Sequence, residues 1–215
     1  IQDLPGFAEG AWWVQDAAAA MPARILLQAT ATSTDSRVAD LCSAPGGKTL
    51  QVAAAGRQVT SMDSSETRLT RVQENLDRMS LKAEIVHADM MRWTPPQLFN
   101  AVLLDAPCSA TGTLRRHPDL GYLKKRRDVL AYPETQKALL KRAAEFLTPG
   151  GVLVYAVCSL EPEEGQGVVD AVLKDAGLSR QPIDPAPLGL DSNWIDSAGA
   201  LRTLPYYWHH RGGLD

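Results

Sequence analysis

The alternation of short apolar runs with longer segments of helical spacing is the feature that most constrains the fold of this chain. Runs of strand length lie at 37–41, 58–62, 83–87, 100–104 and 152–157. Helices are predicted at 17–27, 48–55, 64–79, 133–147 and 161–176. Strands and helices that alternate in this way form a parallel sheet through right-handed crossovers. The sequence therefore predicts an α/β fold with a mostly parallel central sheet and helices on both faces, and the alternation is lost after Gly177.

The composition is that of a globular protein, because 45% of the 215 residues are hydrophobic and 22% are charged. No apolar run approaches the roughly 20 residues that a membrane helix needs, so no membrane partner is expected. The start lacks a secretory signal and an initiator Met, which indicates a fragment of a longer polypeptide. Three widely separated cysteines argue against a disulfide framework and a zinc site, so we expect no metal and a cytoplasmic location.

The charge is unevenly distributed along the chain. The formal net charge of −3 argues against strong nucleic-acid binding by this domain alone. The segment 115–128 nonetheless carries six Lys or Arg side chains against two Asp. Such a run is typical of a solvated helix face or of a phosphate-binding surface, and composition leaves both open.

The turn after the first predicted strand, DLCSAPGGKT at 40–49, separates the cofactor classes. A phosphate-binding P-loop needs a glycine where Cys42 stands, and the dinucleotide pattern G-x-G-x-x-G is absent. S-adenosylmethionine is the third interpretation, because Gly46 and Gly47 let the backbone approach a ligand closely. The candidate loop residues are Cys42, Ser43, Ala44, Pro45, Gly46, Gly47 and Lys48.

Carboxylates follow the next three predicted strands. Asp63 is placed to accept ribose hydroxyls and Asp89 to accept from an adenine amino group, and Asp105 ends the fourth strand. Each alone is an ordinary turn residue. Three carboxylates at successive strand ends after a glycine-rich loop favour a methyl-donor site over a nucleoside triphosphate site or a nicotinamide site.

Two cysteines, Cys108 and Cys158, each follow an apolar strand and open a polar loop. If the strands are neighbours, both thiols emerge at the ligand-binding edge of the sheet. A thiolate that adds to C6 of a cytosine activates C5 for methylation, and a second group must then remove the C5 proton. Asp105 ends the strand that precedes Cys108, and its carboxyl group could stabilise the polarised cytosine ring near N3. The alternative for each cysteine is a small buried hydrophobic residue.

The chain resembles the catalytic domain of the Sun/Fmu family of bacterial 16S ribosomal RNA cytosine-C5 methyltransferases (the small-subunit methyltransferase B type). The matching stretches are LPGFAEGAWWVQDAA, DLCSAPGGKT, MDSSETRL, HADMM, LLDAPCSATGTLRRHPD and VYAVCSLEPEEG. The resemblance implies a Rossmann-like class I methyltransferase fold, S-adenosylmethionine as cofactor and 16S ribosomal RNA as partner. It also implies that Cys158 is the nucleophile, that Cys108 assists proton removal and product release, and that Asp105 contacts the base beside the donor. The loop 42–48, Asp63 and Asp89 would hold S-adenosylmethionine.

The resemblance also bears on domain organisation. Family members often have Thr where Val157 stands, carry an N-terminal helical RNA-binding domain, and end with a further strand beyond this chain. We therefore expect a helical or hairpin extension over 1–35, packed on a methyltransferase domain over 36–215 that lacks those two parts.

The residues after Cys108 are candidates for RNA contact. Arg115, Arg116 and His117 follow the thiol closely enough to reach phosphate, whereas 124–127 could equally form a solvated face. Trp12 and Trp13 are expected in core packing rather than base stacking. His209, His210 and Arg211 are expected in a loop without metal. The rival functions are transfer RNA methylation, DNA cytosine methylation with Cys108 as nucleophile, and a non-catalytic RNA-binding module with a vestigial donor pocket.

Overall fold

The structure is a computed structural model that describes residues 1–33, 35–204 and 207. It divides into two compact units, Ile1–Ala176 and Gly177–Asp215. The division predicted at residues 35 and 36 stays a prediction. No helix in the described part of the chain combines the length and apolar character needed to cross a membrane.

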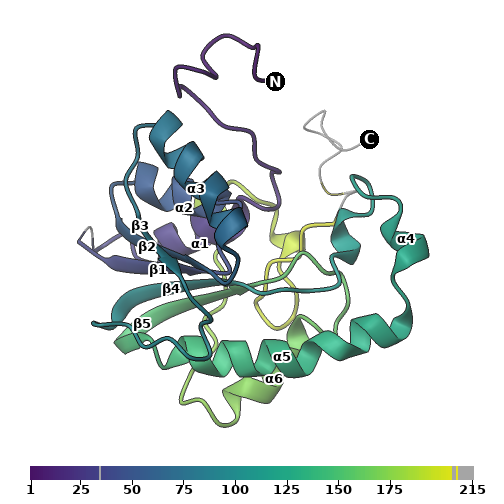
Figure 1. The fold of residues 1–215 in the computed structure, drawn as a ribbon. Helices are drawn as coiled ribbons and strands as arrows, with labels where there is room; N and C mark the ends of the chain where they lie inside the picture. The colour runs from purple at the N-terminus through teal and green to yellow at the C-terminus, as the bar shows by residue number, and fades with distance from the viewer. Residues whose placement is uncertain (34, 205–206, 208–215) are drawn as a thin grey trace. The chain divides into compact units, whose positions relative to one another are not determined.

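The first unit is built on a five-stranded parallel sheet with strand order β3-β2-β1-β4-β5 (Figure 1). The strands are β1 (Arg37–Leu41), β2 (Gln58–Asp63), β3 (Glu84–His87), β4 (Phe99–Asp105) and β5 (Leu147–Ala156). The chain winds outward from β1 to β3, then returns to β4 on the other side of β1. The strand order therefore reverses between β1 and β4, which is where open α/β sheets bind ligands at their carboxyl ends.

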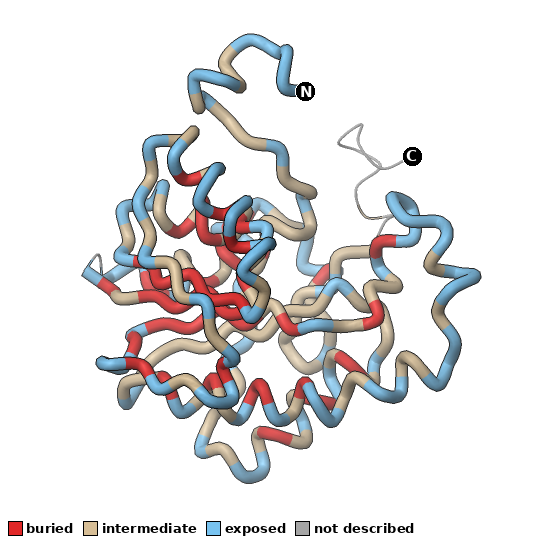
Figure 2. Tube along the Cα trace, in the orientation of Figure 1, coloured by how far each residue is buried: buried red, intermediate tan, exposed pale blue. Residues whose placement is uncertain are grey.

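Helices cover both faces of this sheet (Figure 1). One face carries α1 (Met21–Ala29), α2 (Gly47–Ala54) and α3 (Glu66–Arg78), and the other carries α5 (Arg126–Ala144) and α6 (Gln166–Leu173). Alternate residues of β4 serve the two cores, since Leu103 packs with α1 and Val102 and Leu104 pack with α5 and α6. Figure 2 shows the buried residues gathered in the central strands. The predicted α/β fold, a parallel sheet with helices on both faces, is confirmed.

Three predicted helices have wrong limits, and local contacts explain two of them. Asp16 does accept from the backbone N–H of Ala18 and Ala19, at 2.8 and 3.2 Å, but this closes a turn, and the helix begins only at Met21. The helix predicted from Pro133 begins at Arg126, where the Asp128 carboxylate caps the first turn by accepting from the Lys125 N–H at 2.8 Å. The helix predicted over 161–176 is shorter, Gln166–Leu173.

The remaining elements are short. In the first unit these are η1 (Thr111–Thr113) and α4 (Leu120–Leu123), which follow the first thiol. The second unit holds η2 (Ala186–Leu188), η3 (Ser192–Trp194) and an antiparallel bridge between Ile195 and Leu201. Within that unit Trp194 and Tyr207 stack with ring centroids 5.3 Å apart.

Candidate active site

The loop after β1 is shaped by two residues with positive φ, Cys42 at 56° and Gly46 at 98°. A Cβ on Gly46 would lie 2.9 Å from Cγ1 of Val72 in α3, so a side chain is excluded there by backbone conformation and by packing. The N–H of Ser43 donates to the Met62 carbonyl at 3.0 Å, which fastens the loop to β2. The loop also contains a cis peptide between Ala44 and Pro45.

Asp63, at the end of β2, binds the backbone of this loop. Its carboxylate accepts from the Ala44 N–H at 3.2 Å, from the Ser65 N–H at 2.9 Å and from the Arg68 guanidinium at 2.7 Å. The side chain is 1% exposed. Asp63 therefore orders the loop, and its contact with ribose stays a prediction.

A buried polar chain that the sequence did not reveal lies beneath the same loop. The Thr49 hydroxyl donates to the Asp40 carboxyl at 2.6 Å and lies 3.0 Å from the Ser61 hydroxyl, which donates to Ser43 at 2.8 Å. Asp40 is completely buried, and burial raises its pKa to about 7, with smaller contributions from Asp105 and Asp63. The chain links the loop to β1, β2 and α2.

The other two predicted carboxylates are more open. Asp89 is 54% exposed, accepts from the Met91 N–H at 3.0 Å and lies 3.8 Å from Arg92, so it retains acceptor capacity for a ligand. Asp105, at the end of β4, forms a 2.6 Å ion pair with Lys48 of α2. This pair spans the point where the strand order reverses. Because Lys48 is paired with a carboxylate, and other carboxylates surround the loop, these acceptor groups fit ligand hydroxyl, amino and sulfonium groups better than phosphate.

The two predicted thiols meet. Sγ of Cys108 and Sγ of Cys158 lie 3.3 Å apart, and Cys158 is the exposed one. Their hydrogen bond lowers the pKa of Cys158 and raises that of Cys108, so Cys158 is the thiol of the pair that ionises first, with Cys108 as its donor. Nearby Lys48 further lowers the Cys158 pKa, whereas burial and Asp105 oppose this. The geometry therefore places a thiol with a lowered pKa beside a thiol with a raised pKa, and the nucleophile role of Cys158 stays a prediction.

The sequence model of the family described as "16S rRNA methyltransferase RsmB/F" matches residues 26–206. The chain belongs to this RsmB/F family. Enzymes of this family depend on S-adenosylmethionine, which confirms the predicted cofactor. The Rossmann-like methyltransferase fold predicted from the sequence is also confirmed. The resemblance found in the sequence is likewise confirmed.

Individual relatives agree with the family match. The ribosomal RNA small subunit methyltransferase B of Klebsiella pneumoniae is 44% identical over 178 residues, which are 80% of this chain and 40% of that protein. The enzyme of the same name from Vibrio cholerae is 43% identical over 197 residues, 88% of this chain and 44% of its own length. The chain thus spans less than half the length of these curated relatives.

A solved structure is also similar to this chain. The crystal structure of NSun6 from Pyrococcus horikoshii with SFG, an S-adenosylmethionine analogue, is 28% identical with a TM-score of 0.77. The similarity covers 86% of this chain and 47% of that one.

The third cysteine of this RsmB/F-family chain differs from the thiol pair. Burial, followed by the charges of Asp63, Asp105 and Asp40, raises the pKa of Cys42 to about 12. Cys42 therefore remains a neutral thiol in the loop and is excluded as a nucleophile at neutral pH.

This difference predicts selective alkylation. At pH 7.5 the thiolate fraction of Cys42 is below about 10⁻⁴, whereas Cys158 ionises at a lower pH than an ordinary cysteine. Because thiolate forms as pH rises through the pKa, the iodoacetamide rate at Cys158 should rise and level off before that at Cys42 begins to climb. Peptide mass spectrometry of alkylated protein across pH measures both rates, and faster reaction at Cys42 would contradict the assignment.

The predicted RNA-contact residues of the family domain lie on the surface. Arg115, Arg116 and His117 are exposed, and Arg116 lies 3.6 Å from Asp16. Trp13 packs against the α2–α3 core, as expected. Trp12 instead lies edge-on to Phe7 in the N-terminal segment and belongs to none of the core clusters of the described residues. His209, His210 and Arg211 lie outside the described residues. Among the residues that the structure does describe, no cluster of His, Cys, Asp and Glu is suited to a metal ion.

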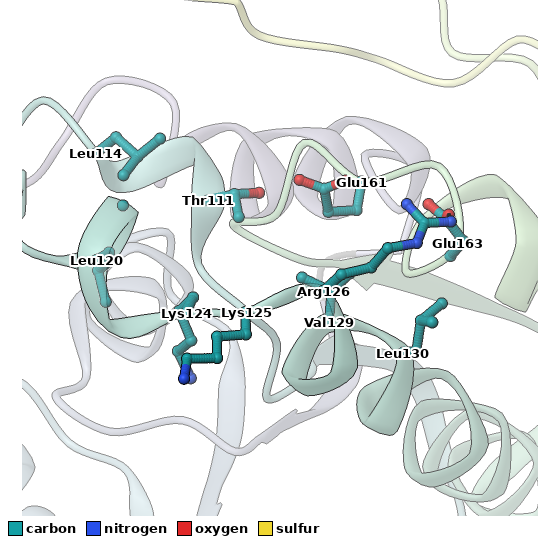
Figure 3. A pocket seen from close by; sticks show the side chains of 11 residues that line it. Thr111, Leu114, Leu120, Lys124, Lys125, Arg126, Val129, Leu130, Glu161 and Glu163 are labelled. Atoms are coloured by element: carbon teal, nitrogen blue, oxygen red, sulfur yellow. Dashed lines mark ion pairs between the residues drawn. The ribbon is translucent and has the colours of Figure 1, made fainter.

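A pocket of about 260 Å³ opens beside the thiol loops (Figure 3). Thr111 and Glu161, from the loops that follow Cys108 and Cys158, line one side of it. The first turn of α5 and the residues before it supply Lys124, Lys125 and Arg126 on the other. Arg126 lies 3.9 Å from Glu163, across the mouth of the pocket. The sequence did not indicate this pocket.

Proposed function

We propose that this chain is the catalytic domain of an enzyme that methylates C5 of a cytosine in small-subunit ribosomal RNA. The observation that carries the proposal is the 3.3 Å contact between Cys108 and Cys158 at the carboxyl edge of the sheet. Family membership supports ribosomal RNA as the substrate class and S-adenosylmethionine as the methyl donor.

The thiol pair suits this chemistry because C5 of cytosine is a weak nucleophile. Addition of the Cys158 thiolate to C6 forms a sulfur–carbon bond and moves electron density to C5. When bound, S-adenosylmethionine supplies the methyl group that C5 takes up. The ring is restored when the C5 proton leaves to a base and the C6–sulfur bond breaks, which returns Cys158 to the thiolate state.

Cys108 is the group we assign to the proton. Its own proton is held by the negative charge of Cys158, since the contact between the two thiols is the first cause of its raised pKa. Once Cys158 is bonded to carbon this charge is gone, so Cys108 can release that proton to solvent. The resulting thiolate then accepts the proton from C5. At the end Cys108 holds one proton and Cys158 is again ionised, as before the reaction.

The remaining candidate residues take binding roles. The loop 42–48, Asp63 and Asp89 would hold the methyl donor. Asp105 would contact the base from the end of β4, where its pairing with Lys48 fixes its carboxylate. The loop after β1 and Asp105 lie at the strand-order reversal, so a methyl donor bound there would share one edge of the sheet with the thiols.

The surface over residues 114–130, here called the RNA-facing segment, suits a single-stranded substrate. It contains six cationic side chains and two carboxylates. It also exposes apolar groups, above all Tyr122 at 89% and Leu123 at 65%. Cations beside exposed rings bind phosphates and stacked bases, and a cytosine must leave its stack to reach Cys158. This segment begins next to the thiol loops, because the Gly112 N–H donates to the Cys158 carbonyl at 2.9 Å.

The test is methyl transfer by this chain from labelled S-adenosylmethionine to 16S ribosomal RNA. Nucleoside mass spectrometry should find the label in 5-methylcytosine, with transfer RNA and DNA of matched sequence as control substrates. The rate at low RNA concentration should fall with rising salt, and less steeply in Lys124→Gln/Lys125→Gln, because phosphate contacts release counterions. Labelling of DNA alone would favour the DNA rival, and donor binding without any transfer would favour the non-catalytic module.

The thiol electrostatics support RNA over DNA methylation. DNA cytosine methylation would use Cys108, the thiol after Pro107, as nucleophile. The hydrogen bond between the thiols instead raises the pKa of Cys108 and lowers that of Cys158, which makes Cys158 the more readily ionised thiol. A location in the cytoplasm stays a prediction.

A further inference from the structure

A single buried carboxylate connects the two thiol loops. Glu164 lies between β5 and α6 and is completely buried. It accepts from the Ser109 N–H at 2.9 Å, from the Ser109 hydroxyl, and from the Ser159 hydroxyl at 2.8 Å. Ser109 directly follows Cys108, and Ser159 directly follows Cys158. Each thiol is therefore one residue away from a ligand of the same carboxylate.

A side chain from α5 completes the connection. The amide of Gln136, also completely buried, donates to the Glu164 carboxylate at 2.9 Å and to the Pro107 carbonyl at 2.9 Å. The residues on both sides of Cys108 are thus fixed to this group. The other amide atom of Gln136, its carbonyl oxygen, is buried without a partner. The orientation of Gln136 therefore serves the carboxylate and the Pro107 carbonyl at the cost of its own acceptor.

These contacts come from both thiol loops and from α5. An isolated buried carboxylate is strongly unfavourable, so it persists only where donors surround it. Here the donors come from three segments far apart in the sequence, and the two serine hydroxyls lie 3.1 Å from each other as well. The Tyr155 hydroxyl fixes the main chain at the same point by donating to the Glu164 carbonyl at 2.7 Å.

We propose that Glu164 is a positioning residue that sets the separation of the two reactive thiols by tying both of their loops to one buried carboxylate. It touches neither sulfur. Its effect on methyl transfer rests on the proposed function, whereas its effect on the thiols does not. The contact it maintains is steep in distance, because a shift of about 1 Å removes a hydrogen bond and can slow a reaction about 10²-fold.

The first experiment measures the thiols without RNA. Wild type, Glu164→Ala and Glu164→Gln are equilibrated with mixtures of reduced and oxidised glutathione, and mass spectrometry follows the Cys108–Cys158 disulfide. In Glu164→Ala the effective concentration of one thiol at the other should fall about tenfold. The pH midpoint of Cys158 alkylation should also rise. Glu164→Gln should fall between the two, because its amide carbonyl can still accept from Ser109 and Gln136.

Tyr155→Phe is the matched control, since it removes a buried hydrogen bond to Glu164 but leaves the carboxylate contacts in place. It should lower thermal stability and leave both thiol measurements near wild type. Should Glu164→Ala fail to fold, Ser109→Ala/Ser159→Ala removes the two hydroxyl contacts while the Ser109 N–H contact remains. Folded variants whose thiol measurements match wild type would overturn the proposal.

Methyl transfer gives the second measurement. For Glu164→Ala, kcat should fall about 10²-fold while KM for RNA changes little, since the carboxylate is buried and its hydrogen-bond partners Ser109, Gln136 and Ser159 lie outside the RNA-facing segment. If wild type forms no 5-methylcytosine the proposed function fails, and the disulfide and alkylation results still decide the role of Glu164. If wild type is active and Glu164→Ala keeps its kcat, the positioning role is overturned.

Discussion

Replacing Cys158 by alanine is expected to abolish methyl transfer to RNA, with a fall in rate of about 10⁴-fold or more. Without the sulfur no bond can form at C6, and C5 then lacks the electron density to take up a methyl group. Donor binding should survive, because no hydrogen bond joins Cys158 to the loop that follows β1 among the described residues. A single-turnover assay with labelled donor measures the rate, and calorimetry with S-adenosylmethionine measures donor binding.

Cys158→Ser separates chemistry from shape in this experiment. The hydroxyl preserves the size and polarity of the side chain but does not ionise near neutral pH, so the serine variant should be as inactive as the alanine variant. Both should bind the donor like wild type. Turnover by either variant at the wild-type rate would remove Cys158 from the nucleophile role, and loss of donor binding would mean that the substitution acts on the fold.

The sequence predicted the parts of the site that depend on strand ends. Parallel strands bring their carboxyl ends to one edge, so an apolar run followed by Cys108 and another followed by Cys158 were enough to place both thiols together. The contact of 3.3 Å confirms that placement. The two glycines predicted the loop after β1 for a different reason. Gly46 occupies a backbone conformation that other residues rarely adopt, so a glycine there marks a tight turn.

The sequence could not predict which side chains pair with one another across different segments. Glu164 is one of several acidic residues after Cys158, and its neighbours Glu161 and Glu163 line an open pocket, whereas Glu164 is fully buried. Nothing in the spacing distinguishes them, because the turn that buries Glu164 is fixed by partners on other segments. The pairing of Lys48 with Asp105 is of the same kind, since it joins residues from α2 and β4. The early start of α5 was missed because its first turns face solvent.

Replacing Cys108 by alanine is expected to leave a covalent protein–RNA complex that accumulates during turnover. Cys158 can still attack C6 and C5 can still be methylated, but no thiolate remains to remove the C5 proton, so the C6–sulfur bond cannot break. Incubation with 16S ribosomal RNA and the donor, followed by denaturing electrophoresis, should show a shifted band. Nuclease digestion should return that band to the mobility of the free protein.

The double variant Cys108→Ala/Cys158→Ala is the matched control, because it removes the attacking sulfur and should form no shifted band. Loss of the hydrogen bond between Cys108 and Cys158 has a second effect in Cys108→Ala, which opposes the accumulation of adduct. Because Cys108 lowers the pKa of Cys158, its loss should raise the pH at which attack begins. Adduct should therefore accumulate more slowly near neutral pH and faster as pH rises, whereas release should stay blocked at every pH. Normal turnover by Cys108→Ala without adduct would exclude Cys108 from proton removal, and slow turnover without adduct would restrict its role to the ionisation of Cys158.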